Sequence, residues 1–461
     1  MELSPIVNIE QVQSESKAKQ PTRRPLIHVF TGFRALACLW IFMFHSTLNK
    51  MDEIVKFHIE WVSWSGAAGV TLFFCLSGFV MVWTYGDCEF KSTKCYWSFI
   101  GRRAARLFPL YYFSLLLSIY DIRCVWVKDK SCTREYFILI VSTLLPVRTW
   151  IPYRLDFEKW NAAIWSVQTE WFLYLVFPFL LRLIRYLLNT TKISLLSNVN
   201  NKTKALIRLY FMWFIVLCIS TIPFLFRFTI LDHITNTAYQ FASTSIIYVS
   251  PLTRIFEFTL GILTGIIFIL KSPLDNQMNQ SDMNIVITSL SNDKQQQKNE
   301  SSSTSVSHTN NSHLKYNCHC FMFDIYFLLG LLFFIFICAP LLFNEPMFYG
   351  YSSLICMGPL ISLIMCTYLY FSAKYSLSLT SRLLTTSLLI NMGEISYAFY
   401  CLVDTLPTIF LLISGKNEDS VIMKLFAGIG IAVFARHYIE MPFYTWANRK
   451  LPKCQCQCQC Q

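Results

Sequence analysis

The stretch GFRALACLWIFMFHST, residues 32–47, is almost wholly apolar, yet it contains one arginine and one histidine. Its length is close to the roughly 20 residues with which a helix crosses the hydrocarbon core of a bilayer. Similar stretches recur along the chain, which has 461 residues, 54% of them hydrophobic and only 14% charged. A soluble protein carries about 25% charged residues. The sequence therefore predicts an all-α protein, a polytopic helical bundle in a membrane.

The net charge of +12 raises the alternative of a nucleic-acid-binding protein. The basic residues, however, cluster in short loops beside apolar segments, as the positive-inside rule describes for cytosolic loops. We therefore predict a membrane as the partner and no nucleic acid. Residues 1–26 form a polar tail with basic residues just before the first apolar segment. This predicts a cytosolic N-terminus and a first helix that runs from inside to outside.

The apolar segments predict ten transmembrane helices with both termini in the cytosol. They lie at about 27–47, 66–85, 107–122, 164–187, 207–226, 251–270, 321–343, 350–372, 393–414 and 421–441. The first six helices (27–271) and the last four (319–446) are expected to form one bundle. Between them, residues 272–318 have a composition that predicts a disordered cytosolic loop. Residues 447–461 form a cytosolic tail rich in Cys and Gln.

The segment 136–147 decides this count, because it is apolar but only 12 residues long. That length favours a re-entrant or interfacial segment over a spanning helix. If the segment does not cross, the six basic residues around the following loop lie in the cytosol, as the positive-inside rule expects. If it crosses, they lie outside, where the glycosylation sequons at Asn189 and Asn201 would be usable. We predict that it does not cross.

The seventeen cysteines do not indicate a disulfide scaffold, because most stand singly in apolar segments as small hydrophobic residues. Cys124 and Cys132 share a predicted outer loop and could pair there. The alternating cysteines at 454–460 favour palmitoylation or an inert tail. Neither they nor the Cys-His-Cys at 318–320 have the spacing of a zinc site. We predict no metal and no permanently bound cofactor.

Arg34 and His45 are the two residues of the opening stretch that need an explanation. A charged side chain inside a bilayer normally faces the bundle interior or a water-filled pathway. Eleven residues are three helical turns to within about 20°, so the two side chains share a face about 16 Å apart. This arrangement suits a site that receives an anionic donor from inside and presents its reactive end outside. Taken alone, it also fits an arginine that snorkels to the interface.

Other polar residues recur at helical spacing. Ser166, Glu170 and Tyr174 share a face, and Glu170 is expected at the level of His45, where a carboxylate can orient the imidazole. The preference of acidic residues for a helix start explains Glu170 equally well.

Two further groups have the same two interpretations, functional and structural. Tyr397, Tyr400 and Asp404 form a polar stripe that ordinary interhelical hydrogen bonds also explain. Arg103 and Arg106 share a face at the cytosolic mouth, where paired guanidiniums bind phosphate unless they serve only as topology signals. Arg436 and Glu440 are spaced as a structural i, i+4 ion pair.

Six motifs in order resemble the membrane acyltransferase-3 family. After the arginine, ten residues and histidine of the first segment come LFFCLSGFVM (72–81), RRAARLFPLYY (102–112), WSVQTEWFLYLVFP (165–178), GEISYAFYCL (393–402) and YIEMPF (438–443). The resemblance implies a ten-helix membrane enzyme that moves an acyl group, often acetyl, from cytosolic acyl-CoA to an acceptor hydroxyl, often of a carbohydrate, on the far side. It implies functional roles for Arg34, His45, Arg103 and Arg106.

Two departures from the family pattern concern the acceptor side. The family usually has two carboxylates after its Trp-Ser-Leu motif, whereas here Trp171 follows Glu170, and Asp404 stands where the family has a late histidine. We predict His45 and Glu170 as the catalytic residues. His45 would act as a general base on the acceptor hydroxyl or, alternatively, would carry the acyl group itself.

The remaining predicted site residues bind the two substrates. Acyl-CoA, with acetyl-CoA expected, is the co-substrate, and its phosphates would be held by Arg34, Arg103 and Arg106. A carbohydrate or lipid acceptor would contact Trp165, Ser166, Tyr397 and Asp404. Two rival classes remain open. One is a secondary transporter, in which the arginine and histidine form a proton relay, and the other is an inactive scaffold on the same fold.

Overall fold

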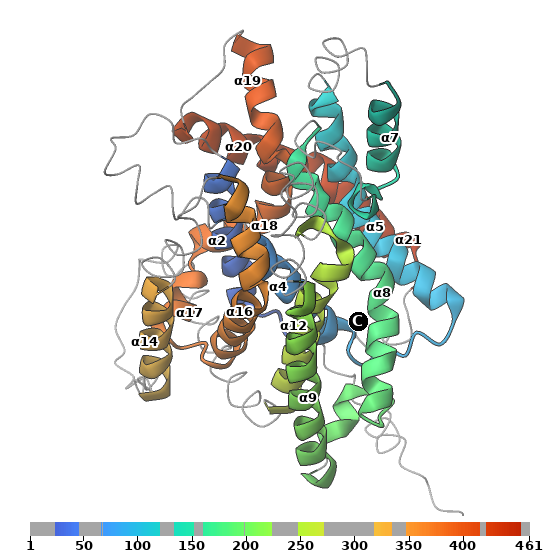
Figure 1. The fold of residues 1–461 in the computed structure, drawn as a ribbon, viewed down its shortest axis with the longest axis vertical. Helices are drawn as coiled ribbons and strands as arrows, with labels where there is room; N and C mark the ends of the chain where they lie inside the picture. The colour runs from blue at the N-terminus through green and yellow to red at the C-terminus, as the bar shows by residue number, and fades with distance from the viewer. Residues whose placement is uncertain are drawn as a thin grey trace, which may run out of the picture.

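The structure of the protein is a computed structural model. It describes residues 24–45, 66, 68–119, 133–151, 160–197, 199–223, 248–271, 318–333, 347–414 and 421–452. Within these ranges the regular secondary structure is entirely helical, and the long helices are gathered into one bundle (Figure 1). The predicted all-α class is therefore confirmed. The predicted pairing of Cys124 with Cys132 and the cysteine tail at 454–460 lie outside the described residues.

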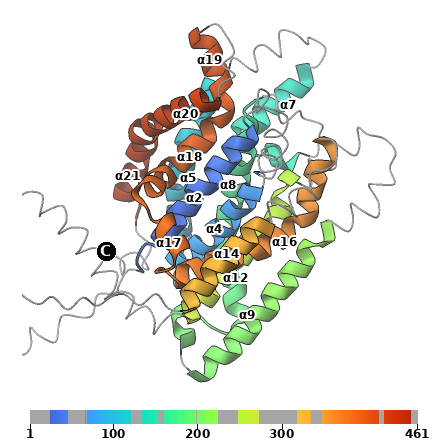
Figure 2. The same ribbon diagram turned by 90° about the vertical axis from the view of Figure 1, so that its left-hand side faces the viewer.

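Six segments of the described chain are long and apolar enough to cross a membrane. They are His28–His45, Ala68–Tyr85, Ala162–Leu187, Asn201–Ser220, Pro251–Lys271 and Val421–Lys450. Each coincides with a predicted span. The helix α9 (Val199–Ser220) lies at the edge of the bundle (Figure 2). Its exposed side chains include Ile207, Phe211 and Phe214, which is expected of a helix whose outer face meets lipid.

The other four predicted spans are not among these six, so the count of ten stays a prediction. They correspond to α5 (Thr93–Leu117), α14 (Cys318–Phe333), α16 (Met347–Lys374) and α18 (Ser387–Leu402). The short helix α7 (Thr133–Leu144) covers most of the predicted non-crossing segment. Its twelve residues extend about 18 Å, less than the roughly 30 Å of a hydrocarbon core, so α7 alone cannot cross.

The predicted span 393–414 is broken in the structure. Helix α18 ends at Leu402, a 3-10 turn, η8 (Val403–Thr405), follows, and α19 (Leu406–Ser414) begins after it. Pro407 gives a physical reason, because a proline removes the hydrogen bond to the carbonyl four residues earlier and crowds it. That carbonyl belongs to Val403, the first residue of the turn. In both views α19 projects at the same end of the bundle as α7 (Figures 1 and 2).

Two tight helix pairs build the core around the site. Helix α2 (His28–His45) packs on α18, and α4 (Ala68–Tyr85) packs on α12 (Pro251–Lys271). A Cβ added to Gly393 would collide with the carbonyl of Thr31, and one added to Gly78 would collide with that of Phe258. Small residues at such crossings let two backbones touch. In the first pair, the close crossing therefore holds α2, which carries Arg34, directly against α18.

The last helix changes pitch within the segment predicted as a span. Helix α20 (Val421–Ala435) passes into five π-helical residues, η9 (Arg436–Glu440), before α21 (Met441–Lys450). Pro442 lies in the first turn of α21, where its ring and missing N–H disturb the preceding turn. Widened turns of this kind frequently occur at functional sites, and this one borders the cavity described below.

Candidate active site

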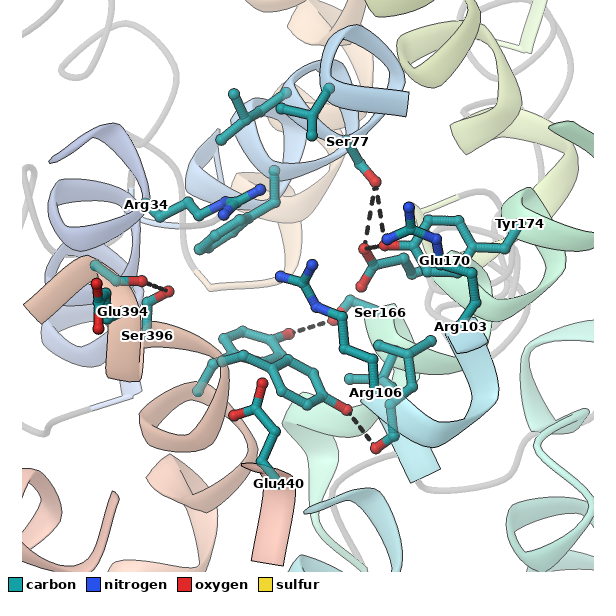
Figure 3. Close-up of a pocket in the computed structure, with 18 of the residues that line it drawn as sticks. Arg34, Ser77, Arg103, Arg106, Ser166, Glu170, Tyr174, Glu394, Ser396 and Glu440 are labelled. Carbon is teal, nitrogen blue, oxygen red and sulfur yellow. Dashed lines mark hydrogen bonds between the residues drawn. The ribbon is translucent and has the colours of Figure 1, made fainter. Parts of the chain in front are cut away.

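A cavity of about 270 Å³ lies inside the bundle, between α2, α4, α5, α18, the last helix and α8 (Trp165–Leu187) (Figure 3). Its charged lining residues are Arg34, Arg103, Arg106, Glu170, Glu394, Arg436 and Glu440. Four of these carry a positive charge and three a negative one, so the cavity is net cationic. A desolvated cationic cavity favours an anionic ligand.

The structure brings six of the nine predicted site residues to this one cavity. They are Arg34, Arg103, Arg106, Ser166, Glu170 and Tyr397. The predicted donor-binding arginines thus lie together, although they come from two different helices. The other three, His45, Trp165 and Asp404, do not line the cavity.

The three inner arginines share a distinctive property. Among the described residues, Arg34, Arg103 and Arg106 have no hydrogen-bond or ion-pair partner, although each is at least partly buried and they repel one another electrostatically. Buried polar groups are normally hydrogen-bonded. Three guanidiniums aimed into one cavity, as Figure 3 shows, therefore have the composition of an anion site rather than of a structural ion-pair network.

Aromatic rings hold Arg103 in place. Its guanidinium carbon lies 5.0 Å from the ring centre of Tyr85, 5.3 Å from that of Tyr174 and 5.7 Å from that of Phe99. All three rings are buried. Cation–π contacts occupy the face of a guanidinium and leave its N–H edge available. The rings thus orient Arg103 without competing for the hydrogen bonds that a phosphate would accept.

Glu170 belongs to this arginine end of the cavity. Its Oε1 accepts hydrogen bonds from the Tyr174 hydroxyl and from Ser77 Oγ, the latter at 3.3 Å, and Figure 3 shows both. The prediction that Glu170 orients His45 is wrong. The reason lies in where the helix begins. Ala163, whose N–H binds the carboxylate that contacts His45, comes seven residues before Glu170. Seven residues separate them by about 10 Å along the axis.

Asp404 is the partner of His45. His45 Nδ1 lies 2.7 Å from Asp404 Oδ1, and Asp404 Oδ2 accepts a hydrogen bond of 2.6 Å from the Ala163 backbone N–H. The break in the helix at η8 positions Asp404 for both contacts. With Nδ1 donating to the carboxylate, Nε2 is left as the nitrogen that can accept a proton. Asp404 therefore has the contact with His45 that was expected of Glu170.

The 3-10 turn η4 (Ala162–Ile164) is held against this pair. Asn161, which precedes the turn, has a positive φ of 43° and donates a hydrogen bond of 3.1 Å to the Cys401 carbonyl. Asparagine is one of the residues that tolerate this left-handed conformation. The bond fixes the start of α8 to the end of α18, which keeps Ala163 N–H beside Asp404.

Arg148 is a functional candidate that the sequence did not single out. It lies in the short 3-10 turn η3 (Arg148–Trp150), is fully buried, and donates a hydrogen bond of 3.1 Å to the Trp160 carbonyl. Burial lowers the pKa of its guanidinium to about 10, whereas Tyr111 and Asp404 act in the opposite direction. Arg148 is therefore charged at neutral pH and contributes a positive field at Asp404. A single arginine in a loop carries no pattern that could have revealed this.

Ala163 stands between the cavity lining and the His45–Asp404 pair and is hydrogen-bonded on both sides. Ser166 Oγ and Tyr400 Oη, which both line the cavity, are 2.6 Å apart. The Tyr400 hydroxyl also lies 2.7 Å from the carbonyl oxygen of Ala163, the residue whose N–H binds Asp404. Ala163 thus contacts the cavity residue Tyr400 through its carbonyl and Asp404 through its N–H, two groups of neighbouring peptide units.

Two predicted acceptor residues, Tyr397 and Trp165, already contact other groups of the chain. The Tyr397 hydroxyl donates to the Leu107 carbonyl at 2.7 Å. Trp165 points away from the cavity, with its ring 5.1 Å from that of Tyr248 and 5.6 Å from the guanidinium of Arg254. Adjacent helical residues project about 100° apart, so Ser166 faces the cavity and Trp165 does not.

The predicted pair between Arg436 and Glu440 is absent from the described ion pairs. Arg436 Nη2 instead lies 2.9 Å from Glu394 Oε2 on α18. Glu440 is buried, and its Oε2 has no hydrogen-bond partner within the described part of the chain. The i, i+4 rule applies to α-helical pitch, whereas these two residues are the ends of the π-helical segment η9.

Comparison with known proteins shows the family of the chain. The family model for acyltransferase 3, described as an acyltransferase domain, matches residues 27–435. Acyltransferase MdmB of Streptomyces mycarofaciens is 29% identical over 170 residues, which make up 36% of this chain and 42% of that protein. The match thus spans less than half of that relative's length. No solved structure matches this chain. Since the family match covers most of the chain and the apolar helices, this multi-pass membrane protein belongs to the acyltransferase-3 family.

Proposed function

We propose that the protein transfers an acyl group, with acetyl expected, from cytosolic acyl-CoA to a hydroxyl of a carbohydrate or lipid acceptor on the far side of the membrane. One observation carries the proposal. The cavity presents three guanidiniums without a hydrogen-bond partner among the described residues, and hydrogen bonds connect its lining to a histidine–carboxylate pair. The first group suits a phosphate-bearing donor and the second suits proton removal.

The arginines would hold the donor by its phosphates. Arg34, Arg103 and Arg106 can each bind phosphate oxygens through paired N–H groups. Coenzyme A has phosphates at one end and the thioester at the end of a long, flexible arm. Held by the arginines, the arm can extend along the cavity toward Ser166 and Tyr400. These two residues lie at the cavity end that connects to His45.

His45 would act as the general base. In this step the acceptor oxygen bonds to the thioester carbonyl carbon, the carbon–sulfur bond breaks, and His45 Nε2 takes the hydroxyl proton. Asp404 holds the imidazole through Nδ1 and stabilises its charged form. The sulfur leaves and is protonated to the free thiol, which completes the exchange of ester for thioester.

The orientation of the helix supports a donor from the cytosol. Arg34 lies in the N-terminal half of α2 and His45 at its C-terminal end. The basic residues before α2 favour a cytosolic N-terminus. In that orientation the phosphate end of the cavity faces inward and the histidine faces the far side.

The test is transfer of radiolabelled acetyl from acetyl-CoA to a panel of glycan and lipid acceptors by the purified protein in nanodiscs. We expect a labelled acceptor, with a rate that falls as the pH is lowered and His45 takes up a proton. His45→Gln keeps a polar side chain but cannot act as the base, so turnover should fall by about 10² to 10⁴ while acetyl-CoA still binds. Near-normal turnover of that variant would make His45 structural. Proton-coupled solute flux without acyl transfer would favour a transporter.

A further inference from the structure

The cavity is exposed along one seam. Among its lining residues the exposed side chains are Glu394, at 53%, on α18 and Tyr444, at 38%, on α21. Arg436, between them on η9, has 26% of its side chain exposed. The lining residues from α2, α4, α5 and α8 are buried or half-buried. A ligand that reaches the inner arginines therefore passes between α18 and the last helix.

An ion pair stands at this seam. Arg436 Nη2 lies 2.9 Å from Glu394 Oε2, and Arg436 Nη1 also donates to the Glu394 carbonyl. Ion pairs exposed to solvent contribute little to stability, because water and salt screen them. A ligand with a higher negative charge can therefore replace the Glu394 carboxylate as the partner of Arg436.

Arg436 extends the cationic surface of the cavity outward. Glu440, the last residue of η9, interacts electrostatically with Arg106, Arg436 and Arg34. These charges therefore belong to one electrostatic group. Arg436 is the member nearest the exposed seam, and both ends of η9, Arg436 and Glu440, line the cavity.

We propose that Arg436 binds the 3′-phosphate of the acyl-CoA donor. The phosphate takes the place of the Glu394 carboxylate as the partner of Arg436, so the cavity entrance favours donors that carry this phosphate. The inference rests on the proposed function. If the thioester arm of the donor extends into the cavity, its adenosine end stays at the seam. A phosphate monoester there carries about −1.5 to −2 charges at neutral pH, more than a carboxylate. It also accepts paired N–H bonds from a guanidinium.

The experiment compares the binding of coenzyme A with that of dephospho-coenzyme A, which lacks the 3′-phosphate, to the full-length protein in nanodiscs. The wild type should bind coenzyme A more tightly. In Arg436→Gln the affinity for coenzyme A should fall about tenfold, while that for dephospho-coenzyme A changes little. The discrimination between the two ligands should therefore disappear. Glu394→Gln frees Arg436 and should increase the discrimination.

Arg449→Gln is the matched control, because Arg449 is an exposed arginine of the same C-terminal segment that does not line the cavity. It should keep the wild-type discrimination. An equal loss for both ligands in Arg436→Gln, or the same effect in Arg449→Gln, would overturn the assignment and leave the proposed function intact. If Arg436→Gln does not fold, unchanged discrimination in Glu394→Gln overturns it. Discrimination in the wild type without any acyl transfer would count against the proposed function alone.

Discussion

At the residue scale, the carboxylate that contacts His45 is Asp404, whereas Glu170, which was expected there, lies among the arginines. Glu170 accepts hydrogen bonds from Tyr174 and Ser77, beside the ring-held Arg103. Asp404 binds His45 at 2.7 Å. Both acids lie in apolar surroundings, but only the second contacts a group that can remove a proton. Their substitutions should therefore affect different kinetic constants.

Glu170→Gln should lower the Kd for acetyl-CoA, because the loss of one carboxylate makes the cavity more cationic and so favours an anionic ligand. Asp404→Asn should instead lower kcat, by about 10-fold or more, with little change in that Kd, because the imidazole loses its charged partner. Calorimetric titration with acetyl-CoA and steady-state kinetics would separate the two effects. If Glu170→Gln reduced kcat alone, its assignment to the donor end would be wrong.

At the element scale, hydrogen bonds hold η4 between the cavity residue Tyr400 of α18 and the His45–Asp404 pair. Tyr400→Phe removes a hydroxyl that lies 2.6 Å from Ser166 Oγ and 2.7 Å from the Ala163 carbonyl. Turnover should fall roughly five- to tenfold. In a double-mutant cycle with Asp404→Asn, the effects on turnover should be non-additive, because both residues contact Ala163.

Tyr397→Phe is the matched control for that cycle. Tyr397 lies on the same helix and lines the same cavity, but its hydroxyl donates to Leu107 at 2.7 Å and does not contact Ala163. Its effect should therefore add to that of Asp404→Asn. Additive behaviour of Tyr400 as well would mean that η4 does not couple the cavity to His45.

The crossing of α2 and α18 is a second feature at this scale. Gly393→Ala would place a Cβ against the Thr31 carbonyl, so the helices must separate, at a cost of about 1–3 kcal/mol. The melting temperature in detergent should fall. Gly430→Ala on α20 is the control, because no atom lies within 4 Å of a Cβ built there. It should be neutral or slightly stabilising, since alanine favours a helix. Equal melting temperatures for the two variants would contradict the close crossing.

At the scale of the whole molecule, the topology depends on where the loop after α8 lies. Six basic residues in and around that loop favour the cytosol, although Asn189 and Asn201 stand in glycosylation sequons. We expect neither asparagine to carry a glycan when the protein is made in mammalian microsomes. Glycosidase treatment should therefore leave its gel mobility unchanged. A glycan at either position would place the loop outside and overturn the ten-helix count.

The sequence by itself determined the membrane class, the positions of six apolar helices and a group of arginines that line one cavity. Hydrophobicity and helical spacing are local properties, and Arg34, Arg103 and Arg106 line one cavity as their positions in the sequence indicated. Glu170 was also placed correctly on a polar helix face, but its partner was not. The partner depends on the level at which each helix begins, which apolar periodicity specifies only to within a turn or two.

Only the tertiary structure decided which charged groups meet. Asp404, in the helix break η8, reaches His45, and Arg436, at the start of η9, pairs with Glu394 of α18. Arg148 lies near Asp404 only through the fold of a loop far from it in sequence. Each contact joins segments more than 40 residues apart, and its geometry depends on breaks in helical pitch. A local pattern of residue types contains no information about either the neighbouring helix or the exact rotation of its face.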